Sequence, residues 1–439
     1  MTVSRTFGSL YLKGVADSTA ALFNQSAIYR FCIAFAVFDF LDIFDFIDFS
    51  SFSVVLKYCY AAIILGMMFF YVLKYKSIDL TNLAPIISFL FFVVTGLAFA
   101  FNFLIYDERQ SYVSAFIAPL VFSLAMFIPP NAMMLDARRI TRDLTLLFSV
   151  GTVLYLVEAI VKPLDFVSNF NVLHEVQFLK SINCALALSI SILTGRKTLA
   201  LFLAVVTGIA LFLRPTSTLV LVLIVCLPLA FAFRLRVLSY QVVAVSLSRV
   251  AVMTTWVLVA IIPLLFYFFF DEVGTLIDSV ESYIKVDILG GQSNTSFRLA
   301  VLKYAFAALD KTSLLYGSAL SGSTNVFIAN EVRWWFKFDT SGTAPIHSDF
   351  VIVLVLMGII GYVLFNAMFL IVLKTRFREL ARSDVGGDGI VLQSISIIAV
   401  VALVIYCSVV PFLIYYNHAH VVWMLLLISE VARKVRQLT

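Results

Sequence analysis

The chain has 439 residues, of which 62% are hydrophobic and only 13% are charged, and its mean hydropathy is +1.03. Soluble globular proteins average roughly 45–50% apolar and about 25% charged residues. Because a large part of any water-facing surface must be polar, a soluble fold of this size cannot bury such an excess. The net charge of +5 is too small to indicate binding to nucleic acid. The composition therefore predicts an integral membrane protein.

Apolar runs recur along the whole chain. A spanning helix needs about 20 mostly apolar residues, and about twelve runs approach or exceed that length. They cover residues 28–46, 53–73, 82–105, 112–130, 143–161, 178–195, 198–213, 217–233, 250–270, 347–373, 390–413 and 420–432. We therefore expect an all-α polytopic membrane protein in which residues 1–439 form a single integral membrane domain.

The basic residues are distributed unevenly between the connections. About 20 of the 31 Lys and Arg residues lie in alternate connections, among them Arg138, Arg234 and Arg376. By the positive-inside rule, these connections and both termini are expected in the cytoplasm. The five cysteines lie in or beside apolar runs without a CxxC pair, which favours buried hydrophobes over a disulfide framework or a metal site.

One long polar loop, at residues 271–346, falls on the outer face in this topology. Loops of this length are either functional or disordered. Phe297, Val301 and Tyr304 recur at helical spacing, and Trp334 and Trp335 suit a membrane interface. The pattern predicts a folded loop that contains short helices.

Two arginines stand on the outer face, where the positive-inside bias disfavours them. Arg214 interrupts an apolar stretch at the tip of a tight hairpin, and Arg298 begins the expected loop helix. A guanidinium is a good ligand for a phosphate group, so both are candidates for binding an anion. The alternatives are a snorkelling side chain at Arg214 and a solvated charge at Arg298.

His347 and Asp349 stand where the loop re-enters the membrane, directly before a run from Val351 to Leu373 that is expected to span it. A histidine there can act as a general base at neutral pH, and a nearby carboxylate can orient it. The alternative is an interfacial histidine without a catalytic role.

Two further groups of residues have no assigned role. The aspartates that recur every third residue on the first run indicate a helix end that leaves the membrane, or else a path for cations, and two histidines form a His-x-His pair with no evident third ligand for a metal ion. These residues are Asp39, Asp42, Asp45, Asp48, His418 and His420.

Taken together, the loop and its flanks resemble the bacterial O-antigen polymerase and O-antigen ligase superfamily. The loop of that family reads Arg, a helix, an Asp with a Gly-rich turn, His-Asn-x-(aromatic or Leu), and a Gly-(Ile or Leu)-(Ile or Val)-Gly helix. Here these are Arg298, the helix to Leu309, Asp310, Leu314-Leu315-Tyr316-Gly317, His347-Ser348-Asp349-Phe350, and Gly-Ile-Ile-Gly at 358–361. Ser in place of Asn after the histidine, and Ser318 and Ala319 after Gly317, depart from the pattern.

The resemblance implies a GT-C-like membrane glycosyltransferase of the bacterial inner membrane, with its active site in the periplasm and a glycan on undecaprenyl diphosphate as donor. It implies that Arg214 and Arg298 clamp the departing diphosphate, that His347 is the general base, and that Asp349, Trp334 and Trp335 bind substrate. We expect inverting transfer without a metal ion or other cofactor, and a polysaccharide chain-length regulator as a partner by family analogy.

The sequence is compatible with three functions. A polymerase would transfer the glycan to the terminal sugar hydroxyl of another lipid-linked repeat unit, and this is the favoured hypothesis. A ligase would transfer the finished polymer to the lipid A core. A multi-pass transporter or a flippase for lipid-linked oligosaccharides would also have about twelve spans, but it would normally carry charges or broken helices near mid-membrane.

Overall fold

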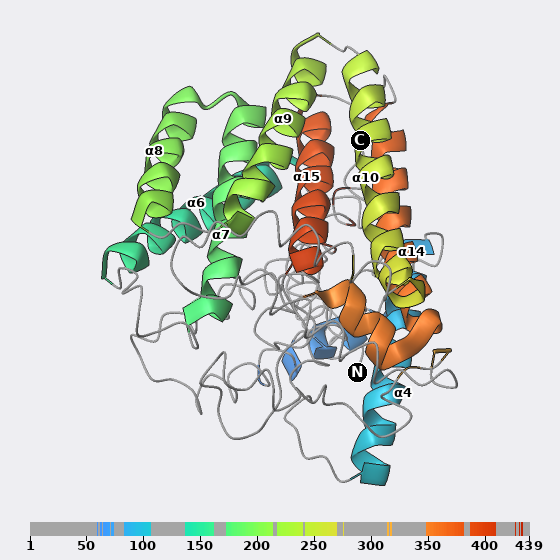
Figure 1. Ribbon diagram of the computed structural model, residues 1–439. Helices are drawn as coiled ribbons and strands as arrows, with labels where there is room; N and C mark the ends of the chain where they lie inside the picture. Colours follow the sequence, from blue (N-terminus) through green and yellow to red (C-terminus); the bar gives the residue numbers. More distant parts are fainter. Residues whose placement is uncertain are drawn as a thin grey trace, which may run out of the picture.

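The computed structural model describes about half of the chain (Figure 1). The described residues are 59, 62–63, 65–70, 72–73, 83–106, 137–161, 173–213, 217–239, 242–269, 275, 314–315, 317, 348–381, 387–409, 426, 430 and 432. Within them every regular element is an α-helix and there is no strand. The long helices are α4 Leu83–Tyr106, α6 Ala137–Val161, α7 Leu173–Thr194, α8 Lys197–Leu213, α9 Ser217–Ser239, α10 Val242–Phe268, α14 Asp349–Leu380 and α15 Gly387–Val409.

Five of the described helices, α6, α9, α10, α14 and α15, contain stretches long and apolar enough to cross a membrane. Helices α4, α7 and α8 contain shorter apolar stretches. The described part of the chain thus has the make-up of an α-helical membrane protein. Of the other expected spans, 28–46 and 112–130 lie outside the described residues, and 53–73 and 420–432 are described only in part.

The helices agree with the apolar runs but extend past them at polar ends. Helix α6 begins six residues before the run at 143–161, and α10 begins eight residues before the run at 250–270. The added turns contain Arg138 and Arg249. Hydropathy marks where a helix crosses hydrocarbon, whereas hydrogen bonding lets the same helix continue into the polar layer.

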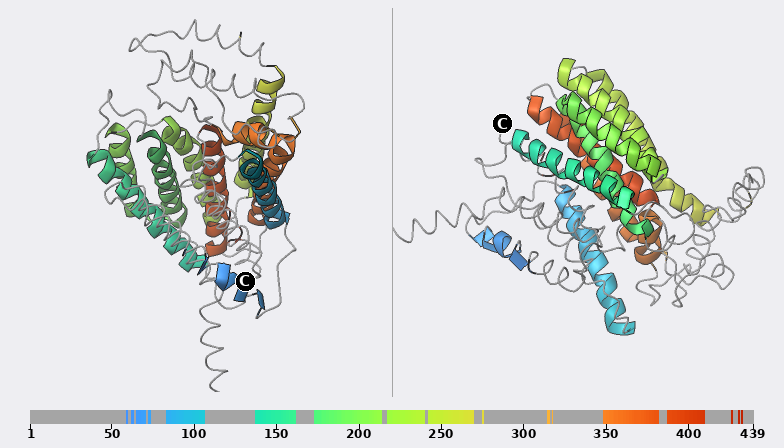
Figure 2. Two further views of the ribbon diagram at one scale, coloured as in Figure 1. Left: turned by 90° about the horizontal axis from the view of Figure 1, so that it is seen from below. Right: turned by 90° about the vertical axis from the view of Figure 1, so that its left-hand side faces the viewer.

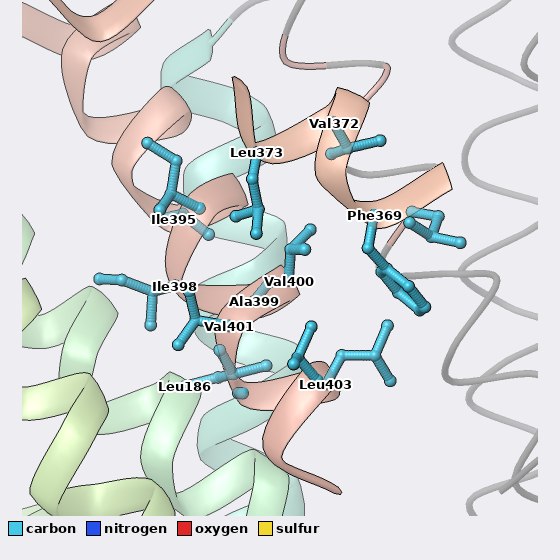
Figure 3. Packing of buried hydrophobic residues seen from close by; sticks show 14 of the residues in the cluster. Leu186, Phe369, Val372, Leu373, Ile395, Ile398, Ala399, Val400, Val401 and Leu403 are labelled. Atoms are coloured by element: carbon cyan, nitrogen blue, oxygen red, sulfur yellow. The ribbon is translucent and has the colours of Figure 1, made fainter. Parts of the chain in front are cut away.

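Helix α15 is the central element of the described bundle. It contacts α6, α7, α9, α10 and α14, and nearly all of its residues are buried (Figures 1 and 2). Its apolar side chains interleave with those of α14 and α7, as Figure 3 shows for Val400 and Leu403 beside Phe369 and for Ile398 beside Leu186. Helix α10, by contrast, leaves most of its apolar side chains exposed.

Arginines mark one end of the bundle, which we call the basic end. Arg138 at the start of α6 lies 3.4 Å from Asp388 at the start of α15. Arg376 near the end of α14 donates to Gln393 near the start of α15. The ends of α7 and α9 lie at this same, upper end in Figure 1, where Arg234 of α9 donates to the Leu193 carbonyl.

A glycine turn at the basic end joins α7 to α8. The Gly195 N–H donates to the Ile192 carbonyl and the Arg196 N–H to the Ser191 carbonyl, at 3.1 and 3.0 Å. This pair of bonds is the Schellman motif, which requires a left-handed residue, and Gly195 has φ +71°. The Arg234 Nη1–Leu193 O distance is 2.7 Å, so α9 satisfies a further carbonyl at the end of α7.

Gly195→Ala is expected to destabilise the protein. An added Cβ would lie 2.5 Å from Arg234 Nη2, and a left-handed alanine costs about 1–2 kcal/mol before any clash. Gly208→Ala is the matched control, because Gly208 is exposed within α8 with no atom within 4 Å of its Cβ position. Thermal unfolding in detergent should show a lower Tm for Gly195→Ala, and for Gly208→Ala an unchanged or higher one. Equal Tm values for the two variants would contradict this account of the turn.

Candidate functional site

Most of the residues that the sequence singles out lie outside the described part of the chain. These are Arg214, Arg298, Trp334, Trp335 and His347. Asp349 is the first residue of α14, and its side chain is not among those described. The expected proximity of His347 and Asp349 to the two arginines therefore remains a prediction, but segments on both sides of the loop are described.

Helix α14 is broken at Gly358. The chain there adopts φ 63° and ψ −164°, which divides the helix into residues 349–357 and 359–380. This region of backbone conformation is essentially restricted to glycine. In Figure 1 the first segment lies across the lower end of α15, and the rest of α14 turns upward behind α10. The run from Val351 to Leu373, which was expected to span the membrane, is thus divided between two helical segments. An apolar run does not reveal such a change of direction.

The break is bridged by the backbone of Leu314 and Leu315, two residues that we call the strap. The Ile359 N–H donates to the Leu314 carbonyl at 2.9 Å, and the Ile360 N–H donates to the Leu315 carbonyl at 3.5 Å. A helix that restarts after a break has first N–H groups without partners in the helix. The strap provides those partners, and Gly317, with φ +80°, follows it.

The second glycine of the Gly-Ile-Ile-Gly sequence has a different role. A Cβ on Gly361 would lie 2.3 Å from the Cβ of Met357, closer than two non-bonded carbon atoms can approach. Gly358 therefore permits the backbone conformation, while Gly361 permits the two halves of α14 to approach each other. The segments that carry the family resemblance, 314–317 and 358–361, thus meet at one place in the structure.

Aromatic side chains hold the first segment of α14 against the bundle. Phe350 is buried, with ring centroids 5.7 Å from Trp256 of α10 and 5.2 Å from Phe365. The Tyr362 hydroxyl donates to the Ala260 carbonyl of α10. The segment that follows the candidate base in the chain is thus held against α10 from both sides of the break.

Ser348 connects the start of α14 to α15. Its backbone occupies the cap position with φ −163° and ψ 122°, but its side chain does not cap the helix. The hydroxyl instead donates to the Cys407 carbonyl, at 3.5 Å. Cys407 lies near the end of α15, so the residue beside the candidate base is at the end of the bundle opposite the basic end.

The length of the second part of α14 indicates the depth of the break. The part of α14 after the break, 359–380, has 22 residues, which as a helix extend about 33 Å. The hydrocarbon layer is about 30 Å thick. Because this stretch can cross the layer by itself, the break at Gly358 fits the membrane boundary better than the midplane.

A buried ionic cluster at the basic end is absent from the sequence-based predictions. Arg376, counted there among the cytoplasmic basic residues, is only 1% exposed and lies beside Glu379, Glu430 and Gln393. The spacing of Arg376 and Glu379 by three residues could have indicated a pair on one helix face. Glu430 stands in an apolar run 54 positions from Arg376, and single-sequence patterns do not connect the two.

No protein-family model matches this chain, and no curated protein is significantly similar to it. Among the residues that the structure describes, no three His, Cys, Asp or Glu side chains are grouped so that they could hold a metal ion. His418 and His420 lie outside those residues. Support for a function therefore comes from the local geometry and from the sequence motifs.

Gly358→Ala is expected to weaken the contact between strap and break. A non-glycine residue in this conformation costs about 1–3 kcal/mol. Gly66→Ala is the control, because Gly66 lies in a described helical stretch with no atom within 4 Å of its Cβ position. Thermal unfolding in detergent should give a lower Tm for Gly358→Ala than for the control, and proteolysis near residue 315 should become faster. An unchanged protease pattern and Tm would mean that the break does not depend on glycine.

Proposed function

We propose that this protein is a surface-polysaccharide polymerase of the O-antigen polymerase type, a membrane glycosyltransferase that acts at the periplasmic face of the inner membrane. It transfers a glycan from undecaprenyl diphosphate to the terminal sugar hydroxyl of another lipid-linked repeat unit. The observation that carries the proposal is the contact of the strap with the Gly358 break. Two motif segments of the resemblance are joined there by backbone hydrogen bonds between residues 45 positions apart.

The proposed chemistry follows from the residue types. His347 accepts the proton of the acceptor hydroxyl, and the oxygen attacks the anomeric carbon of the donor sugar from the side opposite the diphosphate. The bond from that carbon to the diphosphate oxygen breaks, and the lipid diphosphate leaves. Arg214 and Arg298 bind the negative charge that develops on it, so no metal ion is required. Asp349 orients the base or a sugar, and Trp334 and Trp335 stack on sugar rings.

The location of the break supports surface chemistry. The donor has its lipid tail in the membrane and its diphosphate at the boundary, so the reacting bond lies at the level where α14 is interrupted. The first segment of α14 begins two residues after His347 and is held by α10 and α15. A base close to such an anchored helix end would keep a fixed height relative to the membrane surface.

A ligase that transfers the polymer to the lipid A core would use the same donor and the same geometry, so it remains the second candidate. A transporter or flippase is the third, because broken helices are common in transporters. Transporter breaks lie near the midplane, where they form a binding site, whereas the break here fits the boundary. We also propose that both termini and the basic end lie in the cytoplasm. A polysaccharide chain-length regulator is proposed as a partner.

His347→Ala is expected to abolish polymer formation while the protein remains in the membrane. In a null strain complemented with this variant, a gel of surface polysaccharide should show only core plus a single repeat, where wild type gives a ladder. His174→Ala, which changes a histidine outside the motif segments, is the control and should give the wild-type ladder. Polymer that accumulates on the lipid carrier would identify a ligase. A normal ladder from His347→Ala would refute the proposed chemistry and favour the transporter.

Arg214 and Arg298 are each expected to be required for full transfer activity, and lysine is expected to replace neither of them fully. Arg298→Ala and Arg214→Ala should each lower the rate of polymer formation by roughly 100-fold, because a group that stabilises the leaving diphosphate is lost. Lysine at either position should recover only part of the rate, since it cannot form the two parallel bonds of a guanidinium. The measurement is turnover of lipid-linked repeats in membranes with matched protein levels. Full activity in the alanine variants would exclude a diphosphate clamp.

A further inference from the structure

Arg376 is the largest side chain that the described structure buries completely, and it lies in a cluster of polar groups from three parts of the chain. Its Nη1 is 2.6 Å from Glu379 Oε2 of the same helix and 3.3 Å from Gln393 Oε1 of α15. Its Nη2 is 3.8 Å from Glu430 Oε2. Glu430 is itself 3% exposed, so this is a buried ion pair and not a surface contact.

Gln393 extends the cluster to the backbone of the C-terminal segment. Its Nε2 donates to the Ala432 carbonyl at 2.7 Å, while its Oε1 accepts from Arg376. One guanidinium and one amide thus connect α14, α15 and the segment at 430–432. The guanidinium thus has an acceptor in its own helix, Glu379, and a second one in α15, Gln393.

The rest of the interface between α14 and α15 consists mainly of apolar side chains. Phe369, Val372 and Leu373 of α14 pack beside Ile395 and Val400 of α15 (Figure 3). Contacts of this kind have little directionality, and in a membrane the surrounding lipid is as apolar as they are. They hold the helices together but discriminate weakly between axial positions. The hydrogen bonds from Arg376 to Gln393 and from Gln393 to the Ala432 carbonyl are directional. Fixing register is the best-attested role of such buried polar groups.

We propose that Arg376, Glu379, Gln393 and Glu430 form a latch that fixes the axial position of α14 against α15 and the C-terminal segment. The latch thereby holds the Gly358 break in place against the strap. Arg376 is 18 positions from Gly358 along a continuous helix, so a shift at the latch moves the break by the same amount. One residue of helix corresponds to about 1.5 Å, enough to separate Ile359 and Ile360 from their acceptor carbonyls.

The latch is a positioning device, and Arg376 acts on the candidate site only through α14. The axial position itself does not depend on the proposed function. Only its effect on polysaccharide synthesis rests on that proposal. The experiment therefore uses a structural readout at the break and records polymer formation separately.

The readout is a cross-link between strap and break. Leu315→Cys and Ile360→Cys are introduced into the full-length protein, with Cys32 and Cys59 replaced by serine. Both introduced positions are partly exposed, at 47% and 42%, and their contact is made by backbone atoms that the substitutions leave in place. The rate of oxidative cross-linking in membranes then measures how well the break is held against the strap.

The latch is altered in four ways. Arg376→Met leaves the buried carboxylate of Glu430 without its partner, and folded yield should fall at least tenfold. Glu430→Met leaves Arg376 paired with Glu379, so its folded yield should fall less but remain below that of wild type. The double variant removes both charges and should recover folded protein to within twofold of wild type, yet cross-link at least tenfold more slowly. Glu430→Gln, which keeps the shape of the side chain, should fold and also cross-link more slowly. Arg378→Met is the control, because Arg378 is exposed two positions away, and it should cross-link at the wild-type rate.

Wild-type cross-linking in the double variant would overturn the proposal, as would single variants with the folded yield of Arg378→Met. If the double variant gives no folded protein, Glu430→Gln decides, and a wild-type rate there overturns the proposal. Slow cross-linking together with a normal polysaccharide ladder would leave the latch established and would count against the proposed function of the break.

Discussion

A peptide N–H group that a helix leaves without a partner needs another acceptor, and α14 depends on this requirement where it is interrupted. The break at Gly358 leaves Ile359 and Ile360 without partners in their own helix, and the carbonyls of Leu314 and Leu315 accept from them. The first part of α14 can therefore turn across the end of the bundle and still be packed through Phe350. The orientation of the residues around the candidate base follows from how these two donors are satisfied.

The helical class and most helix positions could be predicted from hydropathy, as α8 at Lys197–Leu213 shows beside the run at 198–213. The break could not, because Gly358 lies in an uninterrupted apolar run and its left-handed φ leaves no hydropathic trace. The sequence indicates Gly358 and Gly361 as part of a motif, but it does not indicate the backbone conformation at Gly358 or the close approach at Gly361. For the candidate site, the sequence indicates His347, Arg298 and Arg214 by residue type, but contacts such as Ser348 with Cys407 depend on the fold.

The positive-inside rule treats Arg138 and Arg376 alike, as cytoplasmic charges, whereas the structure shows that their surroundings differ. Arg138 is exposed and pairs at the surface with Asp388, as a topological charge would, and such a pair contributes little stability. Arg376 belongs to the same set by sequence but is enclosed by carboxylates and an amide. Counting charges cannot separate the two, since the groups beside Arg376 include Gln393 and Glu430, which are remote from it in the chain. The two ends of α14 are thus held by different means, one by backbone hydrogen bonds and the other by an ion pair.

The central position of α15 has a consequence for biosynthesis. Among the long helices that the structure describes, α15 is the last in the chain, so α6, α7, α9 and α10 are made before the surface on which they pack exists. Buried serine and threonine side chains of these early helices, such as Thr152 and Ser191, bond to their own backbones, which lets each helix enter lipid alone. Helices α6, α7 and α9 also contact one another, so it is the packing against α15 that waits until translation has passed residue 409. A ribosome that stalls before α15 would release a bundle without its central helix, and the surfaces that α15 covers would be accessible to the quality-control proteases of the membrane.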